Sequence, residues 1–193
     1  MDKKSKIILI AGPTASGKSD FAIKLAKKFK GEIINSDSMQ IYKEIKILNA
    51  RPKVKEIKKI THHLYGFHSV KNNFSTGDWL KKVLKTIKQV KKKNKIPILV
   101  GGTGLYFKAI ISGLAKIPTV PTKYRNKIRE NHRKIGQKKF YKNLIKLDPL
   151  VKSKINANDA QRSIRAFEVK KYTRLSLFKW FEKTKKYFDE NEF

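Results

Sequence analysis

The 193-residue sequence contains no cysteine and no long apolar run. Without cysteine, the chain can form neither disulfides nor thiolate metal sites, which favours a cytoplasmic protein. No stretch is apolar enough for long enough to span a bilayer. The first predicted strand starts so close to Met1 that no signal peptide is expected. We therefore expect a globular cytoplasmic protein that does not associate with a membrane.

Acidic residues are also scarce, with 15 aspartates and glutamates against 47 lysines and arginines. The formal net charge of +32 is typical of proteins that bind nucleic acid. A second explanation is compositional, because lysine, isoleucine and asparagine are abundant along the whole chain, as an AT-rich genome would encode. Both explanations predict that the chain binds polyanions at low salt.

One glycine-rich stretch has the spacing of a phosphate-binding loop: Gly12, Pro13, Thr14, Ala15, Ser16, Gly17, Lys18 and Ser19. It lies between an apolar run at 7–10, predicted as a strand, and a helical pattern at 21–26, which is the context that the motif requires. The glycines let successive backbone N–H groups face an anion, and the helix that starts near Gly17 adds its positive dipole. Lys18 supplies a cation, and the Ser19 hydroxyl can reach Mg²⁺ bound to a diphosphate or triphosphate.

Further along, apolar strands alternate with amphipathic helices, which predicts a parallel sheet flanked by helices. Residues 31–35 and 96–100 are predicted strands, and Asp37 and Thr103 follow them closely. Both side chains are therefore expected at the sheet edge where α/β folds bind ligands. Asp37 is a candidate Mg²⁺ ligand together with Ser19, a candidate general base, or a simple helix cap.

A short strand is predicted over 61–67. It contains His62 and His63, which as neighbours on a strand face opposite sides. We therefore expect the two histidines to make separate hydrogen bonds rather than to share one metal ion.

Two prolines, Pro118 and Pro121, mark a change to a helical, basic composition. They predict an α/β domain over 1–118 and a helical domain over 119–193. In the second domain, Asp159 is expected to cap a helix. The first turns of that helix carry residues suited to a phosphate or a base edge, although a solvated helix face would have a similar composition. These residues are Gln161, Arg162 and Arg165.

Five stretches, taken together and in this order, resemble the tRNA dimethylallyltransferases. They are the glycine-rich loop and residues 37–42, 62–64, 100–106 and 158–162. The resemblance implies a P-loop NTPase-like parallel sheet flanked by helices, with a helical insertion domain that binds tRNA. It also implies transfer of a dimethylallyl group from dimethylallyl diphosphate to N6 of an adenosine adjacent to the tRNA anticodon.

The resemblance implies a role for each candidate residue. The loop would hold the diphosphate, with Lys18 and Mg²⁺ on Ser19 neutralising the leaving group. Asp37 would accept the N6 proton as general base, with Thr103 as its hydrogen-bonding partner. The implied tRNA contacts are Asp37, Ser38, Met39, Gln40, Thr103, Arg125, Gln161, Arg162, Ser163, Ile164 and Arg165.

Members of this family, which are monomers, continue well beyond the length of this chain. We therefore expect a C-terminally truncated sequence with an incomplete core. Two other functions stay open on the sequence: a P-loop kinase or NTPase that uses the same loop for ATP, and an inactive remnant that binds tRNA.

Overall fold

The computed structural model describes residues 6–45, 51–52 and 59–193. The chain divides into two compact units, one formed by Met1–Gly113 with Lys186–Phe193 and the other by Leu114–Lys185. This division differs from the predicted ranges because the last eight residues belong to the first unit. There the backbone N–H of Ile7 donates a hydrogen bond to the carbonyl of Glu192 at 2.6 Å. No local sequence pattern signals a contact between such distant positions.

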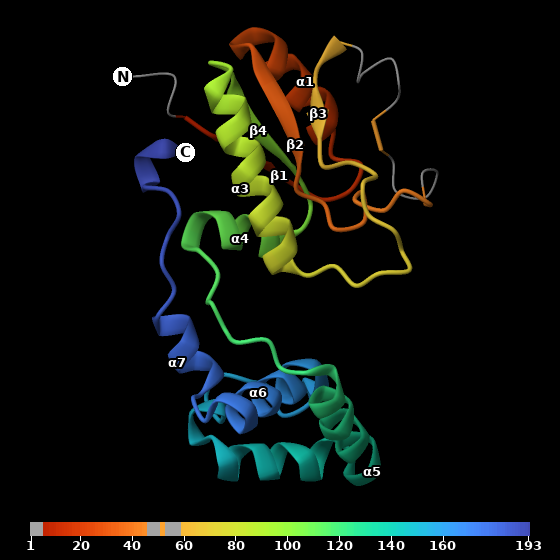
Figure 1. Cartoon of the computed structure of the whole chain (residues 1–193), viewed down its shortest axis with the longest axis vertical. Helices are drawn as coiled ribbons and strands as arrows, with labels where there is room; N and C mark the ends of the chain where they lie inside the picture. Colours follow the sequence, from red (N-terminus) through yellow and green to blue (C-terminus); the bar gives the residue numbers. More distant parts are fainter. Residues whose placement is uncertain (1–5, 46–50, 53–58) are drawn as a thin grey trace. The chain divides into compact units, whose positions relative to one another are not determined.

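The first unit is built on a parallel four-stranded sheet in the order β1-β4-β2-β3 (Figure 1). The strands are β1 (Ile8–Ala11), β2 (Gly31–Asn35), β3 (His62–His63) and β4 (Ile96–Gly101). The helices are α1 (Lys18–Phe29), α3 (Thr76–Lys92) and α4 (Gly104–Ser112), with a 3₁₀ turn η3 (Glu190–Glu192). The predicted parallel sheet with flanking helices is thus confirmed.

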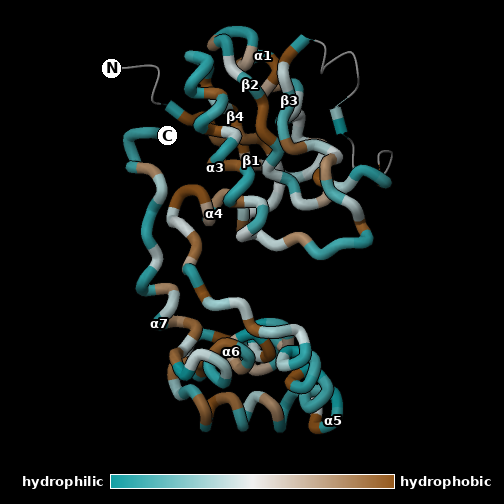
Figure 2. Tube along the Cα trace, viewed as in Figure 1, coloured by the Kyte–Doolittle hydropathy of each residue, from teal (hydrophilic) through white to brown (hydrophobic). Residues whose placement is uncertain are grey.

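Strand β4 lies between β1 and β2 and is buried along most of its length, as expected for a central parallel strand. Hydrophobic residues concentrate in the central strands of the sheet (Figure 2). On one face of the sheet, Ala22 and Ala26 of α1 pack against Ile33 and Ile98. Helix α3 lies across the other face (Figure 1). Its buried stripe consists of Trp79, Leu80, Val83, Thr86, Ile87 and Val90.

Strand β3 is shorter than the prediction of 61–67, because only His62 and His63 pair with β2. The backbone leaves the extended conformation directly afterwards, with φ of 62° at Leu64 and 53° at Gly66. Glycine at 66 is consistent with a turn there, but a leucine in this region gives no such signal.

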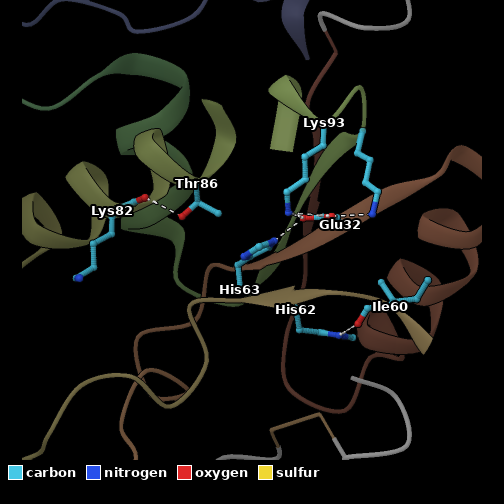
Figure 3. Close-up of polar contacts among 8 residues, drawn as sticks. Glu32, Ile60, His62, His63, Lys82, Thr86 and Lys93 are labelled. Carbon is cyan, nitrogen blue, oxygen red and sulfur yellow. Dashed lines mark hydrogen bonds and ion pairs between the residues drawn. The ribbon is translucent and has the colours of Figure 1, made fainter. Parts of the chain in front are cut away.

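Glu32 of β2 is 1% exposed and is surrounded by basic groups (Figure 3). Its carboxylate lies 2.7 Å from Nε2 of His63, 2.8 Å from Nζ of Lys95 and 3.4 Å from Nζ of Lys93. The ring of His62 points to the other side, where Nδ1 lies 2.7 Å from the carbonyl of Ile60. The two histidines therefore face opposite ways, as predicted, and make separate contacts.

This cluster predicts a loss of stability in acid. Burial by itself raises the pKa of Glu32, but hydrogen bonds from Lys95 and His63 and the charges of Lys95 and Lys93 outweigh it and lower the pKa from 4.5 to about 2. A lowered pKa stabilises the fold above pH 4.5, and that contribution disappears as the pH falls from 4.5 towards 2. The shift corresponds to about 3 kcal/mol.

The measurement is urea unfolding of the wild-type chain and of Glu32→Gln between pH 7 and pH 2.5. Because the variant lacks the titrating group, the difference in unfolding free energy between the two proteins should shrink as the pH falls. A difference that stays constant over this range would contradict the assignment.

The second unit is helical, as predicted, with α5 (Thr122–Leu147), the 3₁₀ turn η2 (Pro149–Val151), α6 (Ala160–Thr173) and α7 (Leu177–Glu182). Helix α5 is interrupted at Gly136, whose φ of 73° and ψ of 162° are not helical. Asp159 caps α6 by accepting a hydrogen bond from the backbone N–H of Arg162, as predicted. The core of this unit comprises Tyr141, Leu144, Val151, Ile155, Ala166, Val169 and Leu177.

Candidate functional site

The glycine-rich loop connects β1 to α1 at the carboxyl end of the sheet. Gly17 has φ of 74° and precedes the first helical residue, so the loop enters the helix through a conformation that glycine adopts without strain. Ala15 also has a positive φ, 64°. The ammonium group of Lys18 donates a hydrogen bond to the carbonyl of Pro13 at 2.8 Å, which keeps the cation beside the loop.

A cavity of about 330 Å³ opens beside this loop. It is lined by Thr14, Ala15, Ser16, Gly17, Lys18, Ser19, Asp20, Asp37, Met39 and Gln40. Most of the predicted loop residues are thus brought together with Asp37 and two of the residues after it. Gly12, Pro13, Ser38 and Thr103 are not among the lining residues.

Asp37 lies in a turn that is stabilised by hydrogen bonds of the Asn35 side chain. Asn35 is fully buried, and its Oδ1 accepts a hydrogen bond from the backbone N–H of Asp37 at 2.9 Å. Its Nδ2 donates to the carbonyls of Asp37 and Leu64 at 2.9 and 3.0 Å. The carboxylate of Asp37 accepts one hydrogen bond through Oδ1, from the backbone N–H of Met39 at 2.8 Å. Within the described part of the chain, Oδ2 of Asp37 accepts no hydrogen bond, and Asp37 lines the cavity.

Replacing Asn35 by alanine is therefore expected to destabilise the first unit by about 2 kcal/mol, because one donor and two acceptors of the half-buried residues Asp37 and Leu64 lose their hydrogen bonds. Urea unfolding measures the loss. Asn35→Asp is the matched variant, since it keeps an acceptor for the Asp37 N–H but loses both donors. A wild-type unfolding curve for the alanine variant would show that Asn35 does not stabilise the turn.

Thr103 reaches the same turn from the other side. Its Oγ1 accepts a hydrogen bond from the backbone N–H of Ser38 at 2.9 Å and donates to the Ser38 hydroxyl at 3.2 Å. Thr103, predicted as the hydrogen-bonding partner of Asp37, thus bonds through its side chain to Ser38, the next residue along the chain. The backbone N–H of Thr103 also donates to the carbonyl of Ser36 at 3.3 Å.

Tyr106 lies behind this segment, stacked on Trp79 with ring centroids 4.0 Å apart. Burial raises the pKa of the Tyr106 hydroxyl to about 12, with smaller contributions from Tyr42 and from the negative charge of Asp37. The phenol therefore stays protonated at neutral pH.

The oxygen-bearing side chains at the cavity are suitable ligands for a hard cation. Ser19 offers a hydroxyl and Asp37 a carboxylate, and Mg²⁺ typically takes one or two carboxylates together with phosphate oxygens. Within residues 6–45, 51–52 and 59–193, no group of three histidine, cysteine or acidic side chains could hold a metal ion.

The predicted contacts of the second unit lie in different environments. Arg125 and Arg165 both approach the carboxylate of Glu168. Arg162 is 76% exposed and pairs with Asp159, and Gln161 is exposed. Ile164 is half-buried. The hydroxyl of Ser163 is buried and accepts a hydrogen bond from Nε2 of Gln137 at 3.2 Å.

Four polar residues, near the cavity and in the second unit, were not predicted from the sequence. Asp20 lines the cavity and could have been noticed because it directly follows Ser19 in the first turn of α1. Asn35 gave no signal inside a predicted strand. Arg129 and Glu168 could have been found from helical spacing, because they lie four and three residues after Arg125 and Arg165.

In the part of the chain that the structure describes, none of the helices has the length and apolar character that crossing a membrane requires.

Comparisons with known proteins agree on one family. A family model described as IPP transferase matches residues 40–192. A tRNA dimethylallyltransferase of Pelagibacter ubique is 61% identical over 193 residues, which are 100% of this chain and 62% of that protein. Another, from Rickettsia massiliae, is 47% identical over 176 residues, which are 91% of this chain and 48% of that protein.

Solved structures give the same result. One of a eukaryotic dimethylallyltransferase acting on tRNA matches with a TM-score of 0.79 at 32% identity, over 93% of this chain and 45% of that one. A full-length tRNA isopentenylpyrophosphate transferase from Bacillus halodurans matches with a TM-score of 0.57 at 33% identity, over 88% of this chain and 56% of that one. The chain thus spans less than two thirds of the length of each of these relatives.

Proposed function

The chain belongs to the IPP transferase family, and on that premise we propose that it transfers a dimethylallyl group from dimethylallyl diphosphate to N6 of an adenosine adjacent to the tRNA anticodon. The relatives named as tRNA dimethylallyltransferases support this substrate pair. The observation that carries the proposal is that one cavity is lined both by most of the glycine-rich loop and by Asp37.

Each side of the cavity has a part in this reaction. The bond between the allylic carbon and the diphosphate oxygen breaks, and a bond forms between that carbon and N6 of adenine. The loop, including Gly12 and Pro13, holds the departing diphosphate, and Lys18 balances the negative charge that develops on it. Asp37 takes the N6 proton through Oδ2, the oxygen that does not bond to the backbone N–H of Met39.

Ser19 and Asp37 are the residues that would hold Mg²⁺ in this site. When bound, the ion supplies positive charge to the diphosphate. The ammonium group of Lys18 is held beside the loop by its hydrogen bond to the carbonyl of Pro13, which supports a role for this cation at the same leaving group.

The tRNA contacts are proposed on both units separately. In the first unit, Ser38, Met39, Gln40 and Thr103 follow or brace the turn that carries Asp37, where the target base would enter after leaving its stack. In the second unit, which we propose as the tRNA-binding insertion, the contacts are Arg125, Gln161, Arg162, Ile164 and Arg165. Ser163 would stabilise α6 rather than contact the tRNA, because its hydroxyl is buried.

The test is single-turnover transfer from radiolabelled dimethylallyl diphosphate to unmodified tRNA in the presence of Mg²⁺. Label in the tRNA with the wild-type chain, absent with Lys18→Ala, is the expected result. Hydrolysis of ATP without label in the tRNA would replace the proposal by a P-loop kinase or NTPase. Salt-sensitive retention of tRNA on a filter, without transfer or hydrolysis, would identify an inactive tRNA-binding remnant.

A further inference from the structure

Three arginines of the second unit surround one buried carboxylate, that of Glu168 on α6. Arg125 and Arg129 lie one turn apart on α5, and Arg165 lies one turn before Glu168 on α6. The guanidinium nitrogens of Arg125, Arg129 and Arg165 lie 3.4, 3.5 and 3.6 Å from the carboxylate oxygens. Two helices of this unit therefore bring three cations to one anion.

The exposure of these side chains is uneven. Glu168 is 1% exposed, whereas Arg125, Arg129 and Arg165 are 42%, 48% and 42% exposed. A buried carboxylate requires a charged or hydrogen-bonded partner. A single arginine would meet this requirement, so the cluster carries more positive charge than the burial of Glu168 needs.

The three arginines also have more N–H donors than the carboxylate of Glu168 can accept. Each guanidinium has five N–H donors in a planar fork, and Arg129 uses its Nε in a hydrogen bond to Glu168 at 3.5 Å. Nε of Arg125 is buried 3.4 Å from the carboxylate of Glu168 and makes no hydrogen bond among the described residues, so it faces Glu168 rather than solvent. The donors that can reach a ligand belong to the exposed parts of the three arginine side chains. Because Glu168 accepts from only part of this donor set, the remaining donors can meet an oxyanion, for which the fork geometry is well suited.

We propose that Glu168 is a positioning residue that holds Arg125, Arg129 and Arg165 together as one docking site for phosphates of the RNA backbone. This inference rests on the proposed function, which makes tRNA the partner. It adds Arg129 to the predicted contacts and Glu168 as the residue that positions them. Most cations of this chain are lysines on flexible stems, whereas arginines anchored by a buried carboxylate lose less conformational freedom when they bind a phosphate.

The first experiment is Glu168→Gln, measured by filter binding of unmodified tRNA over a range of salt concentrations. The substitution raises the net charge by one, so general electrostatic attraction alone predicts tighter binding. If Glu168 positions the arginines, binding instead weakens by about tenfold, because oriented charge-assisted contacts are lost. Tighter binding by this variant would overturn the inference.

The second experiment is Arg129→Gln, which leaves two arginines to pair with Glu168 and keeps the inference testable if Glu168→Gln does not fold. The slope of the logarithm of affinity against the logarithm of salt concentration should decrease by about 1, as expected for one lost phosphate contact. The matched control is Lys127→Gln on the same helix, because Lys127 is exposed and outside the cluster. Its slope should change less than that of Arg129→Gln.

The outcomes separate this inference from the function on which it rests. If the wild-type chain binds tRNA and the slope of Arg129→Gln equals that of the wild type or of Lys127→Gln, the docking site is wrong and the proposed function stands. If the wild-type chain does not bind tRNA at any salt concentration, both are wrong.

Discussion

Replacing Asp37 by asparagine is expected to slow single-turnover transfer to tRNA by about 10²–10⁴-fold, the usual contribution of a general base. Asparagine can still accept the hydrogen bond from the backbone N–H of Met39, so the turn should persist. Asparagine cannot, however, accept the N6 proton as the new carbon–nitrogen bond forms. Affinity for dimethylallyl diphosphate, measured by displacement of labelled ligand, should change only a few-fold.

The control is Asp20→Asn, which removes one negative charge from the same cavity. If the effect of Asp37→Asn arises only from the charge of the cavity, both variants should lose activity equally, and the base assignment is wrong. A titration with Mg²⁺ tests the other role of Asp37. Activity of Asp37→Asn that returns at high Mg²⁺ would identify a metal ligand instead of a base.

Replacing Gly101 by alanine is expected to destabilise the first unit by at least about 3 kcal/mol, because overpacking against the backbone cannot be relieved by a side-chain rotation. A Cβ at this position would lie 2.1 Å from the carbonyl oxygen of Ser36 and 2.7 Å from the backbone nitrogen of Asp37. The two strand ends approach so closely here that only glycine fits. Any adjustment would also move the turn that carries Asp37.

Gly104→Ala is the matched control for this substitution. A Cβ at Gly104 would meet nothing within 4 Å, and Gly104 is the first residue of α4. Since alanine favours helices over glycine, the control should be unchanged or more stable by up to about 1 kcal/mol. Equal unfolding midpoints for the two variants would contradict the close approach at Gly101.

The two tryptophans allow this measurement to be made on one unit at a time. Trp79 is fully buried in the first unit, and Trp180 lies in the second. Urea unfolding followed by fluorescence in a Trp180→Phe background therefore reports on the first unit alone. The transition of Gly101→Ala should occur at a lower urea concentration than that of Gly104→Ala in this background.

Much of the local structure could be predicted because it depends on neighbours in the sequence. The strand at 31–35 was predicted with its observed bounds, and β1 was predicted within one residue of its position. The cap at Asp159 and the phosphate-loop context were read from spacing alone. The length of β3 could not be predicted in this way, because the positive φ of Leu64 is imposed by the fold rather than by leucine.

The sequence by itself determined the family resemblance, the alternation of strands and helices, and a glycine-rich loop with the spacing of a phosphate-binding loop, since each depends on residue types at short, fixed separations. Only the tertiary structure decided that Asn35 holds Asp37 beside that loop, that Gly101 meets Ser36, and that three arginines share Glu168. The reason is physical: these contacts depend on strand order, register and helix packing, which bring together residues that are far apart in the chain.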